Sequence, residues 1–453
     1  MPAVADCTGD VDGDGSVTGA DLAAVLSDWG GSTSDISGDG LVDGEDLAAI
    51  LGAWGPCPSV SDLLLVTPLD GLQTIAMDAE GNTVKSWLGA GVGASVGWLW
   101  PDGSLVRPSQ VTDGSFNSGG RGGRIEIFAP DGTLTNTLIL ATTLMQQHHD
   151  VHPMPNGNIL CITWEWHSVA EALGAGRTTL SASSFWSETI LEIRPTSATT
   201  WETVWQWRLW DHLIQDSDAA KPGFGVVAEH PELCDINFGT VSSVGDWIHM
   251  NAIDYSPERD EILVSSRSLD ELWVIDHSTS TAEAASHAGG THGKGGDFLY
   301  RWGNPQGYDR GTAAHRQFFV VHGATWIDSG LPGAGNILAF NNGDRAGSAN
   351  DWSQVVEIAP PRNADGSYVV PASAAFGPAA PSFTIGTAGE FFGGPTQCGA
   401  FRTLDNTTLV TLTLTRQLLE FDSNGNQMSA RTLTGQIARV PRYRLIDGEW
   451  AGR

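Results

Sequence analysis

Residues 249–267 read HMNAIDYSPERDEILVSSR, and the interpretation of the rest of the chain depends on this stretch. His249 opens a run of mostly apolar residues, residues 256–260 supply a polar turn, and a second apolar run ends in two serines and Arg267. Two apolar runs joined by a short polar turn are typical of an antiparallel β-hairpin. The stretch therefore predicts two paired strands, the first of which begins at a histidine.

Two further stretches have the same layout, namely HHDVHPMPNGNILCITWEW at residues 148–166 and HGATWIDSGLPGAGNILAFNN at residues 322–342. In all three, a histidine precedes a short strand, a turn follows, and Ile-Leu opens the second strand, at residues 159–160, 262–263 and 337–338. If the three repeated hairpins are arranged around one axis, histidines at equivalent positions point into one space. This convergence is the central functional hypothesis.

The composition excludes some classes of ligand and partner. The chain has 453 residues with a formal charge of −30, and its 23 Lys and Arg face 53 Asp and Glu. No basic surface exists to displace phosphate counterions, so we expect no nucleic-acid partner. No apolar run approaches the roughly 18 residues that span a bilayer, so we expect no membrane span. An anionic ligand would need local cations of its own.

The N-terminal segment contains a duplicated acidic loop, DVDGDGSVTGAD at residues 10–21 and DISGDGLVDGED at residues 35–46, each leading into a near-identical apolar helix. Oxygen ligands at alternating positions of a 12-residue loop, with glycine at the sharp turn, suit Ca²⁺. The predicted calcium ligands are Asp10, Asp12, Asp14, Ser16, Thr18 and Asp21 in the first loop and Asp35, Ser37, Asp39, Leu41, Asp43 and Asp46 in the second.

These loop–helix repeats, over about residues 6–57, resemble a dockerin domain, the module that docks onto cohesins in extracellular assemblies. The resemblance implies a small α-helical, EF-hand-type domain over residues 1–57 and a cohesin-like protein partner. Dockerins are exported, so we expect a secreted, periplasmic or cell-surface protein. The first residues, MPAVADCTGD, do not form a signal peptide, so we expect that the signal peptide is absent from this sequence.

The cysteines divide into two groups. Cys7 and Cys57 flank the acidic segment, where a disulfide would tie its ends together. The other three, Cys161, Cys234 and Cys398, lie in or near predicted strands without metal-type spacing, and we expect buried free thiols.

Residues 58–453 consist of short β-type runs separated by turn signals, with almost no helical periodicity. Several share one form, in which an Asp-Gly or Asn-Gly turn joins two strands, as in RIEIFAPDGTLTNTLIL at residues 124–140. Repetition of this form favours a β-propeller over a single sandwich. We therefore predict a mainly β propeller over residues 58–453, for which the hairpins alone allow about five to seven blades.

The three histidine motifs also contain Arg267 but no obvious acid partner. A cluster of this composition suits an anionic group in transfer, because arginine can hold two of its oxygens bidentately. One neutral imidazole can attack as a nucleophile, while a second protonates the leaving oxygen.

The histidine hairpins, together with HMNAID…ILVSSR (249–267) and LYRWGNPQ (299–306), resemble the bacterial arylsulfate sulfotransferase family, and the resemblance covers most of residues 95–425. The first histidine hairpin, WDHLIQD (210–216) and GVVAEHPELCDINF (225–238) resemble an exported branch of that family. The resemblance implies a six-bladed propeller that transfers a sulfuryl group from a phenolic sulfate to a phenolic acceptor. It further implies a ping-pong reaction without a nucleotide sulfate donor or a catalytic cofactor.

Roles can be carried over residue by residue. His322 matches the histidine that becomes sulfated, whereas His249 and Arg267 match residues that bind and polarise the sulfuryl oxygens, with Asn251 beside them. The first histidine position falls on His148 or His149, and the hairpin geometry leaves both open, as sulfuryl ligands or general acid.

Two other functions compete with sulfuryl transfer. His148, His149, Asp150 and His152 are dense enough for a metal-dependent hydrolase, although an extended backbone at Pro153 would point His149 and His152 to opposite sides. The 18 tryptophans are compatible with a non-catalytic propeller that binds glycans or peptides and is anchored through the N-terminal module.

Overall fold

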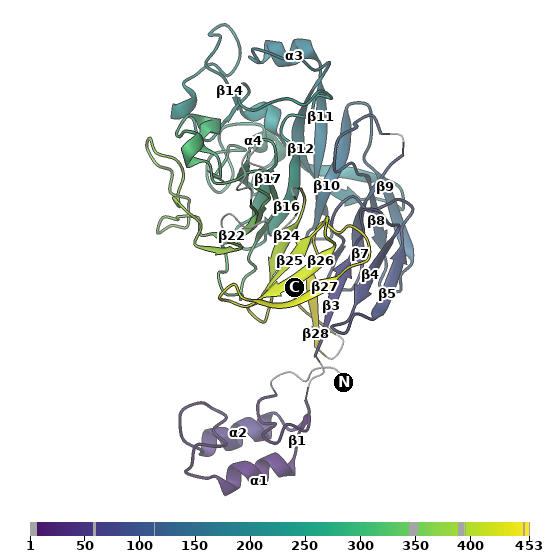
Figure 1. Cartoon of the computed structure of the whole chain (residues 1–453), viewed down its shortest axis with the longest axis vertical. Coiled ribbons are helices and arrows are strands. Elements are labelled where there is room, and N and C mark those ends of the chain that lie inside the picture. The colour runs from purple at the N-terminus through teal and green to yellow at the C-terminus, as the bar shows by residue number, and fades with distance from the viewer. Residues whose placement is uncertain are drawn as a thin grey trace. The chain divides into compact units, whose positions relative to one another are not determined.

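The computed structural model of the chain (Figure 1) describes residues 7–57, 60–112, 114–343, 352–387, 394, 396–446 and 449–452. The chain separates into two compact units. The first contains residues 1–64, 77–84 and 442–453, and the second contains residues 65–76 and 85–441. The predicted domain boundary at residue 57 stays a prediction.

The N-terminal repeats form two helices of equal length, α1 (Gly19–Ser27) and α2 (Gly44–Gly52). Each begins with a reciprocal cap, in which an N-cap side chain and a carboxylate three residues later bind each other's backbone N–H groups. Their apolar faces share one small core, because four side chains are fully buried together: Val17, Val25, Val42 and Ile50.

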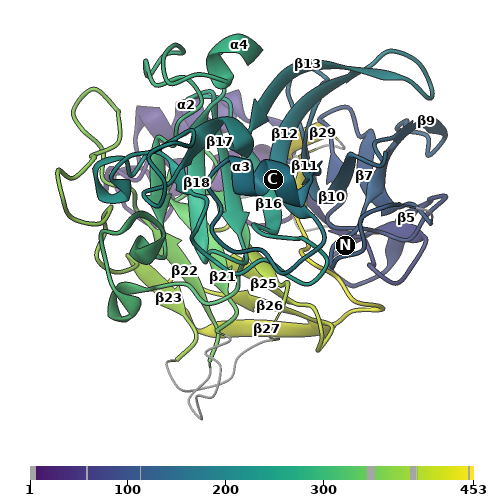
Figure 2. The ribbon, with the colours of Figure 1, turned by 90° about the horizontal axis from the view of Figure 1, so that it is seen from above.

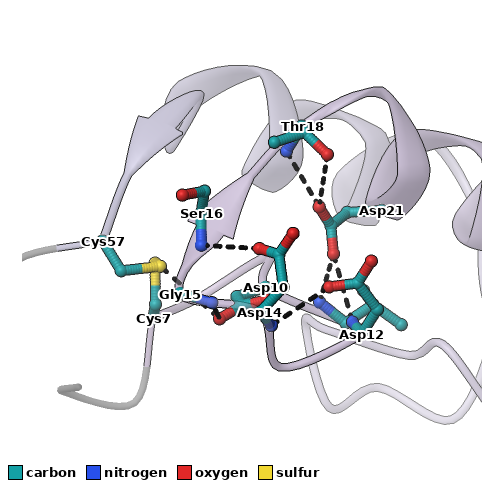
Figure 3. The surroundings of a disulfide bond; sticks show 10 residues. Cys7, Asp10, Asp12, Asp14, Gly15, Ser16, Thr18, Asp21 and Cys57 are labelled. Atoms are coloured by element: carbon teal, nitrogen blue, oxygen red, sulfur yellow. Dashed lines mark hydrogen bonds between the residues drawn. A yellow bond between two sulfur atoms is a disulfide. The ribbon is translucent and has the colours of Figure 1, made fainter. Parts of the chain in front are cut away.

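A disulfide closes this segment (Figure 3). Cys7 and Cys57 are bonded with an S–S distance of 2.02 Å, next to the pairing of β1 (Ser16–Val17) with β2 (Gly55–Pro56). The predicted pairing of these two cysteines is therefore confirmed. Cys161, Cys234 and Cys398 are buried free thiols, also as predicted.

Five antiparallel four-stranded sheets follow one another along the chain, each with its strands hydrogen-bonded in sequence order. The first two contain β6 (Trp98–Leu99), β7 (Leu105–Gln110), β8 (Gly123–Phe128) and β9 (Leu134–Ile139), and β10 (Met145–Pro153), β11 (Ile159–His167), β12 (Phe185–Pro195) and β13 (Trp201–Arg208). The next three contain β16 (Met250–Ser256), β17 (Glu261–Ser266), β18 (Glu271–Asp276) and β19 (Tyr300–Trp302); β20 (Val321–Trp326), β21 (Ile337–Asn341), β22 (Gln354–Ile358) and β23 (Phe383–Ile385); and β24 (Gly399–Arg402), β25 (Thr408–Leu412), β26 (Gln417–Phe421) and β27 (Gln427–Thr432).

A sixth sheet has the strand order β29-β28-β3-β4-β5 and combines strands from both ends of the chain. Its members are β3 (Val60–Val66), β4 (Gln73–Met77), β5 (Thr83–Leu88), β28 (Arg442–Ile446) and β29 (Glu449–Gly452). The remaining elements are the short strands β14 (Leu213–Ile214) and β15 (Cys234–Asp235), the helices α3 (Val169–Gly174) and α4 (Thr281–Ala284), and the 3₁₀ helices η1 (Leu209–His212), η2 (Val227–Glu229), η3 (Pro305–Tyr308) and η4 (Ala313–His315). None of the described helices has the length and apolar character needed to cross a lipid bilayer.

The sheets are arranged as the blades of a propeller. Along the chain, β10 contacts β16, β16 contacts β20, and β20 contacts β24, so the first strands of successive blades lie next to one another. Figure 2 shows these blades succeeding one another around a common centre. The prediction of a mainly β, six-bladed propeller is confirmed. The EF-hand-type assignment of the N-terminal module stays a prediction.

The core lies between adjacent blades. One cluster of buried side chains joins β11 and β13 with β16–β18, and a second joins β17–β19 with β20–β22. All six residues of β17 and of β18 are buried, as expected for strands that are covered on both faces. β17 and β18 are therefore fixed from both faces by apolar packing alone.

One partly buried ion-pair bridge links two blades through a histidine. Nδ1 of His277 lies 2.6 Å from a carboxylate oxygen of Asp260, and its Nε2 lies 3.1 Å from one of Glu192. Burial opposes a charge on this ring, but hydrogen bonds and the charges of the two carboxylates outweigh it and raise the pKa of His277 to about 9.

This bridge makes stability depend on pH. Because the folded state keeps the His277 proton up to about pH 9 and the unfolded chain releases it near 6.5, the stabilisation is complete below pH 6.5 and disappears as the pH rises through 9. Each pKa unit corresponds to about 1.4 kcal/mol, and partial exposure of Asp260 reduces the expected total to on the order of 1–2 kcal/mol. Denaturant unfolding of wild type and His277→Gln at pH 6 and pH 10 measures it. The two proteins should differ at pH 6 and converge at pH 10, while the exposed control His230→Gln matches wild type at both. A pH-independent difference would contradict the bridge.

Candidate active site

Three central strands, β10, β16 and β20, carry the predicted histidines, and each pairs with the next strand as the sequence predicts. Each hairpin contains a register shift of the kind that re-aims side chains beside active sites. His149 and His249 also have left-handed backbone conformations, with φ angles of 46° and 54°. Non-glycine residues rarely adopt this conformation, and it is concentrated at functional sites.

The histidines do not occupy strictly equivalent positions, which corrects the sequence prediction. Met250 and Val321 are the first paired residues of β16 and β20. His249 lies one residue before that point, whereas His322 lies one residue after it. The left-handed backbone at His249 turns its side chain, so that histidines two positions apart in register still act electrostatically on each other.

His322 is held as a neutral ring with a defined tautomer. Its Nδ1 lies 2.8 Å from Oδ1 of Asn342 and 3.1 Å from the carbonyl oxygen of Val320. Both partners are acceptors, so Nδ1 carries the hydrogen and Nε2 carries the lone pair. Burial, assisted by the charges of His249 and Arg267, lowers the pKa of His322 to about 3 even though the two hydrogen bonds oppose this shift. At neutral pH the ring therefore has a nucleophilic nitrogen.

His249 is oriented by an acid. Its Nδ1 lies 2.6 Å from Oδ2 of Asp246, and the same oxygen accepts a 2.6 Å hydrogen bond from Ser118. Burial would raise the pKa of Asp246, but the charge of His249 and these hydrogen bonds keep it below its usual value. The backbone N–H of Arg267 donates to the carbonyl of His249, which fixes the arginine next to this ring.

His148 and His149 have different positions, which the sequence could not decide. His149 faces His249, with ring centroids 4.8 Å apart, and His249, His322 and Arg267 all act on it electrostatically. His148 lies behind it, fully buried and stacked on Trp164. Only His149 therefore belongs to the central cluster.

The two rings are connected to a buried acid. Nδ1 of His149 lies 2.9 Å from Nδ1 of His148, and Nε2 of His148 lies 2.8 Å from Oε2 of Glu188. The other oxygen of Glu188 accepts a hydrogen bond from the N–H of Met250. Burial and the charge of Asp246 raise the pKa of Glu188 well above its usual value, while burial lowers that of His148 to about 3. Because each of these contacts joins one donor to one acceptor, the protonation state of Glu188 sets the tautomer of both imidazoles.

The loop before β8 packs directly on the cluster. A Cβ atom at Gly120 would lie 1.9 Å from Cε1 of His149, and its φ angle is +74°. The carbonyl of Gly120 also accepts a 2.6 Å hydrogen bond from the backbone N–H of His149. Only glycine fits this close approach. The loop therefore packs directly on the His149 ring.

Asn251 lies near the cluster and supports the strands that carry the histidines. Its Oδ1 accepts a 2.7 Å hydrogen bond from Ser265, and its Nδ2 donates at 2.7 Å to the carbonyl of Val321. The carboxamide is buried and ties β16 and β17 to β20 at the residue before His322. It positions the strand that carries His322.

A cavity of about 810 Å³ opens at His249 and Arg267, and Asp246, Phe238 and Arg316 also line it. Its volume lies in the usual range for small-molecule sites. Within the described residues, the Arg267 guanidinium makes no hydrogen bond or ion pair, whereas Arg316 is paired with Asp270. The cavity therefore offers one available cation to an anionic ligand.

The sequence did not predict three side chains that bind the histidines, because the predicted cluster contained no acid. Asp246 precedes His249 by three residues, and Asn342 follows the last residue of β21, so both lay inside or next to the quoted motifs. Glu188 is 40 residues from His148 and is one of two acids in β12. Only the pairing of β11 with β12 brings it to the histidine, and no local signal could have shown this.

The residues of the first histidine motif that resemble a set of metal ligands lie apart in the structure. Asp150 forms an ion pair with Arg439, His152 lies 3.0 Å from Asp254, and His148 binds Glu188. Among the described residues, these side chains do not meet as a three-ligand cluster of His, Cys, Asp or Glu. Nothing in their arrangement favours a metal-dependent hydrolase.

The acidic loops of the N-terminal module fit a cation unequally. In the first loop, carboxylate oxygens of Asp10, Asp12 and Asp21 lie within 4.8 Å of one another (Figure 3). Each also accepts backbone N–H groups from its own loop, which fixes the oxygens in place. The second loop repeats these bonds through Asp35 and Asp46 but has Ser37 at the position of Asp12. The donor set of hard oxygens fits Ca²⁺.

No curated protein sequence matches the chain. Similar solved structures include a protein of unknown function from Bacteroides caccae, with 11% identity and a TM-score of 0.44, covering 84% of this chain and 98% of that chain. They also include the periplasmic gluconolactonase of Pseudomonas aeruginosa, with 12% identity and a TM-score of 0.41, covering 85% of this chain and 99% of that chain. Neither likeness bears on function.

One family model, described as Arylsulfotransferase (ASST), matches residues 101–359, which is more than half of the chain. The matched region contains all three histidine hairpins, Arg267 and the partners Glu188, Asp246 and Asn342. The chain belongs to the arylsulfotransferase (ASST) family.

Proposed function

We propose that the protein transfers a sulfuryl group from a phenolic sulfate ester to a phenolic acceptor through a sulfohistidine at His322, without a nucleotide sulfate donor. One observation carries this proposal: hydrogen bonds from Nδ1 leave the lone pair of His322 on Nε2 of a buried, neutral ring. A nucleophile of this kind, close to the charges of Arg267 and His249, suits attack on an anionic sulfur centre.

In the first half-reaction, Nε2 of His322 attacks sulfur. The N–S bond forms, the S–O bond to the aryl group breaks, and the phenolate oxygen leaves with the electron pair. Arg267 holds the sulfuryl oxygens, because its guanidinium is not engaged by any described residue. His249, oriented by Asp246, also lines the cavity and contacts the same group.

The buried chain Glu188–His148–His149 delivers a proton to the leaving oxygen. With a proton on Glu188, the carboxyl donates to Nε2 of His148, whose Nδ1–H donates to Nδ1 of His149. His149 then presents Nε2–H to the site and protonates the phenolate. Each imidazole changes tautomer, Glu188 becomes a carboxylate, and no ring acquires a net charge.

The second half-reaction restores this arrangement. The acceptor phenol gives its proton to Nε2 of His149 as its oxygen attacks sulfur, the N–S bond to His322 breaks, and the proton returns to Glu188. Water is kept from the intermediate, because His322 and His149 are only 3% and 5% exposed. Exclusion of water favours transfer over hydrolysis.

The first test is acceptor-dependent release of p-nitrophenol from p-nitrophenyl sulfate. Wild type should release it only when a phenol is supplied, and His322→Ala should lose at least about 1,000-fold in kcat, because the nucleophile is gone. His315→Ala, which changes an exposed histidine of η4, should retain full activity.

The same assay separates the other functions. Wild type that releases nothing with any of several phenols would contradict the proposal and favour a glycan- or peptide-binding propeller. Release that is independent of phenol and is abolished by a chelator would instead favour a metal-dependent hydrolase.

The proton chain is tested by Glu188→Gln. Glutamine can still accept from Met250 and donate to His148, but it cannot transfer a proton. We expect a loss of about 10–100-fold in kcat/KM with phenyl sulfate, whose leaving group needs protonation, and less than about 3-fold with p-nitrophenyl sulfate, whose leaving group does not. An equal loss with both donors would assign Glu188 a structural role only.

For the N-terminal module we propose structural Ca²⁺, one ion in each acidic loop, in an exported protein. The disulfide between Cys7 and Cys57 supports an oxidising location, since such bonds persist outside the cytosol. A dockerin-like role with a cohesin-like partner is supported by apolar residues that both repeats leave exposed at matching positions: Leu26, Trp29, Leu51 and Trp54.

Calorimetric titration of the chelator-treated full chain with Ca²⁺ tests the loops. Wild type should bind two ions, and Asp12→Asn should bind one, because Asp12 is exposed and its loss removes a ligand of the first loop only. Glu45→Gln, in the first turn of α2, is a matched acidic control and should bind two. Equal stoichiometry in wild type and Asp12→Asn would contradict a calcium site in the first loop.

A further inference from the structure

A second group of histidines lies outside the cavity. His212 ends η1, after β13, whereas His287 and Asp297 belong to the segment between α4 and β19. Nδ1 of His212 lies 2.8 Å from Oδ1 of Asp297, and Nδ1 of His287 lies 2.7 Å from the same oxygen. Each of the three residues offers a ligand atom that lies within 4.8 Å of the other two. Two imidazole nitrogens and one carboxylate oxygen therefore converge.

The inner ligand of this group is oriented as in metal centres. Nε2 of His212 donates a 2.8 Å hydrogen bond to the carbonyl of Ala284, so its second nitrogen is committed to the protein. The ring is fully buried and stacks on Trp207, with an angle of 4° between the planes. Metal-ligating histidines nearly always donate their other N–H to a carbonyl or carboxylate in this way, which fixes the coordinating nitrogen.

The outer side is open. The His287 side chain is 61% exposed, whereas that of Asp297 is 8% exposed. His212 and Asp297 are thus buried, and His287 lies on the solvent side of them. Three protein ligands with one side facing water are typical of open zinc centres, in which a water molecule completes the coordination.

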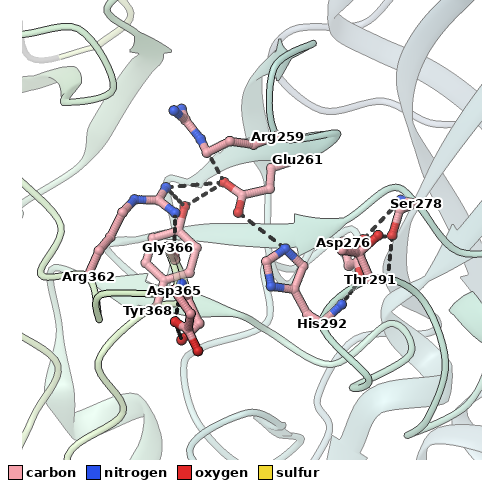
Figure 4. A network of polar contacts seen from close by, with 11 residues as sticks. Arg259, Glu261, Asp276, Ser278, Thr291, His292, Arg362, Asp365, Gly366 and Tyr368 are labelled. Atoms are coloured by element: carbon pink, nitrogen blue, oxygen red, sulfur yellow. Dashed lines mark hydrogen bonds and ion pairs between the residues drawn. The ribbon is translucent and has the colours of Figure 1, made fainter.

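The segment that carries His287 and Asp297 is itself held in place, as Figure 4 shows in part. The backbone N–H of His292 donates to Asp276 at 3.1 Å, and that of Thr291 donates to Ser278 at 2.7 Å. His292 also lies 3.5 Å from Glu261, a buried acid that binds Arg259, Arg362 and Tyr368. The Trp207 indole donates to the carbonyl of Gly296. The segment is therefore ordered before any ion arrives.

We propose that His212, His287 and Asp297 form a binding site for a divalent transition metal of the Zn²⁺ type. Metal–ligand distances of about 2.0–2.2 Å in a tetrahedron place ligand atoms about 3.4 Å apart, so the two contacts to Asp297, at 2.8 and 2.7 Å, would open by about 0.6–0.7 Å. Imidazole nitrogens favour such metals over Ca²⁺ and Mg²⁺. The ion would tie η1 to the segment before β19, between two consecutive blades.

This site is separate from the calcium loops and from sulfuryl transfer, so it can be tested directly. The full chain, stripped of metal and saturated with Ca²⁺, is titrated with Co²⁺ and followed by visible absorption and thermal unfolding, then with Zn²⁺. Wild type should bind one ion with a cobalt spectrum of tetrahedral type, and Zn²⁺ should displace the cobalt and raise the Tm.

Two exposed histidines provide the test variant and its matched control. His287→Ala should weaken Co²⁺ and Zn²⁺ binding at least about 10-fold, the loss typical of removing a metal-site contact, and abolish the Tm increase. His230→Ala, which removes an exposed histidine 3.0 Å from Glu232, should behave as wild type. Unchanged affinity in His287→Ala would overturn the proposal and place any bound ion elsewhere, including at the catalytic histidines. Absence of binding in wild type would show that the carboxylate simply joins two imidazoles.

Discussion

Burial of uncharged imidazole rings at the centre of the propeller is the constraint on which the rest of the site depends. A buried ring cannot easily become an imidazolium, so each of its nitrogens needs a partner of defined donor or acceptor type. His322 receives two acceptors at Nδ1, and His148 lies between His149 and Glu188. The same burial that lowers the pKa of His322 and His148 raises that of Glu188. The proposed nucleophile and the proposed proton reservoir thus have one physical cause, which is burial.

The propeller supplies this environment because every partner comes from a different piece of chain. Glu188 is on β12, Asp246 precedes β16, and Asn342 follows β21, while the loop at Gly120 closes the cluster from the neighbouring blade. β12, which carries Glu188, is buried along residues 185–193, so its packing fixes that acid. The bulged, left-handed backbone at His149 and His249 is the strained part, and the packed blades hold it in place.

Much of this could be predicted from the sequence, and the rest had physical reasons to be missed. Local sequence patterns predict the hairpins, their Ile-Leu registers and the disulfide. They also predict that His249, Arg267 and His322 lie close together. Strict equivalence of the histidines failed, because a bulge changes the register without leaving a mark in the pattern. The choice between His148 and His149 depended on which ring turns inward, which a left-handed φ angle decides. Glu188 required strand pairing over a distance of 40 residues.

The most direct measurement is rapid-quench mass spectrometry of the full chain mixed with excess p-nitrophenyl sulfate and no acceptor. The account predicts a burst of one p-nitrophenol per enzyme, a mass increase of one SO₃ group, and peptide mapping of that group to His322. Addition of phenol should then remove the group at the rate of turnover. A burst without modification of the chain, or SO₃ mapped to His249 or His149 and absent from His322, would contradict the assignment of His322 as the nucleophile.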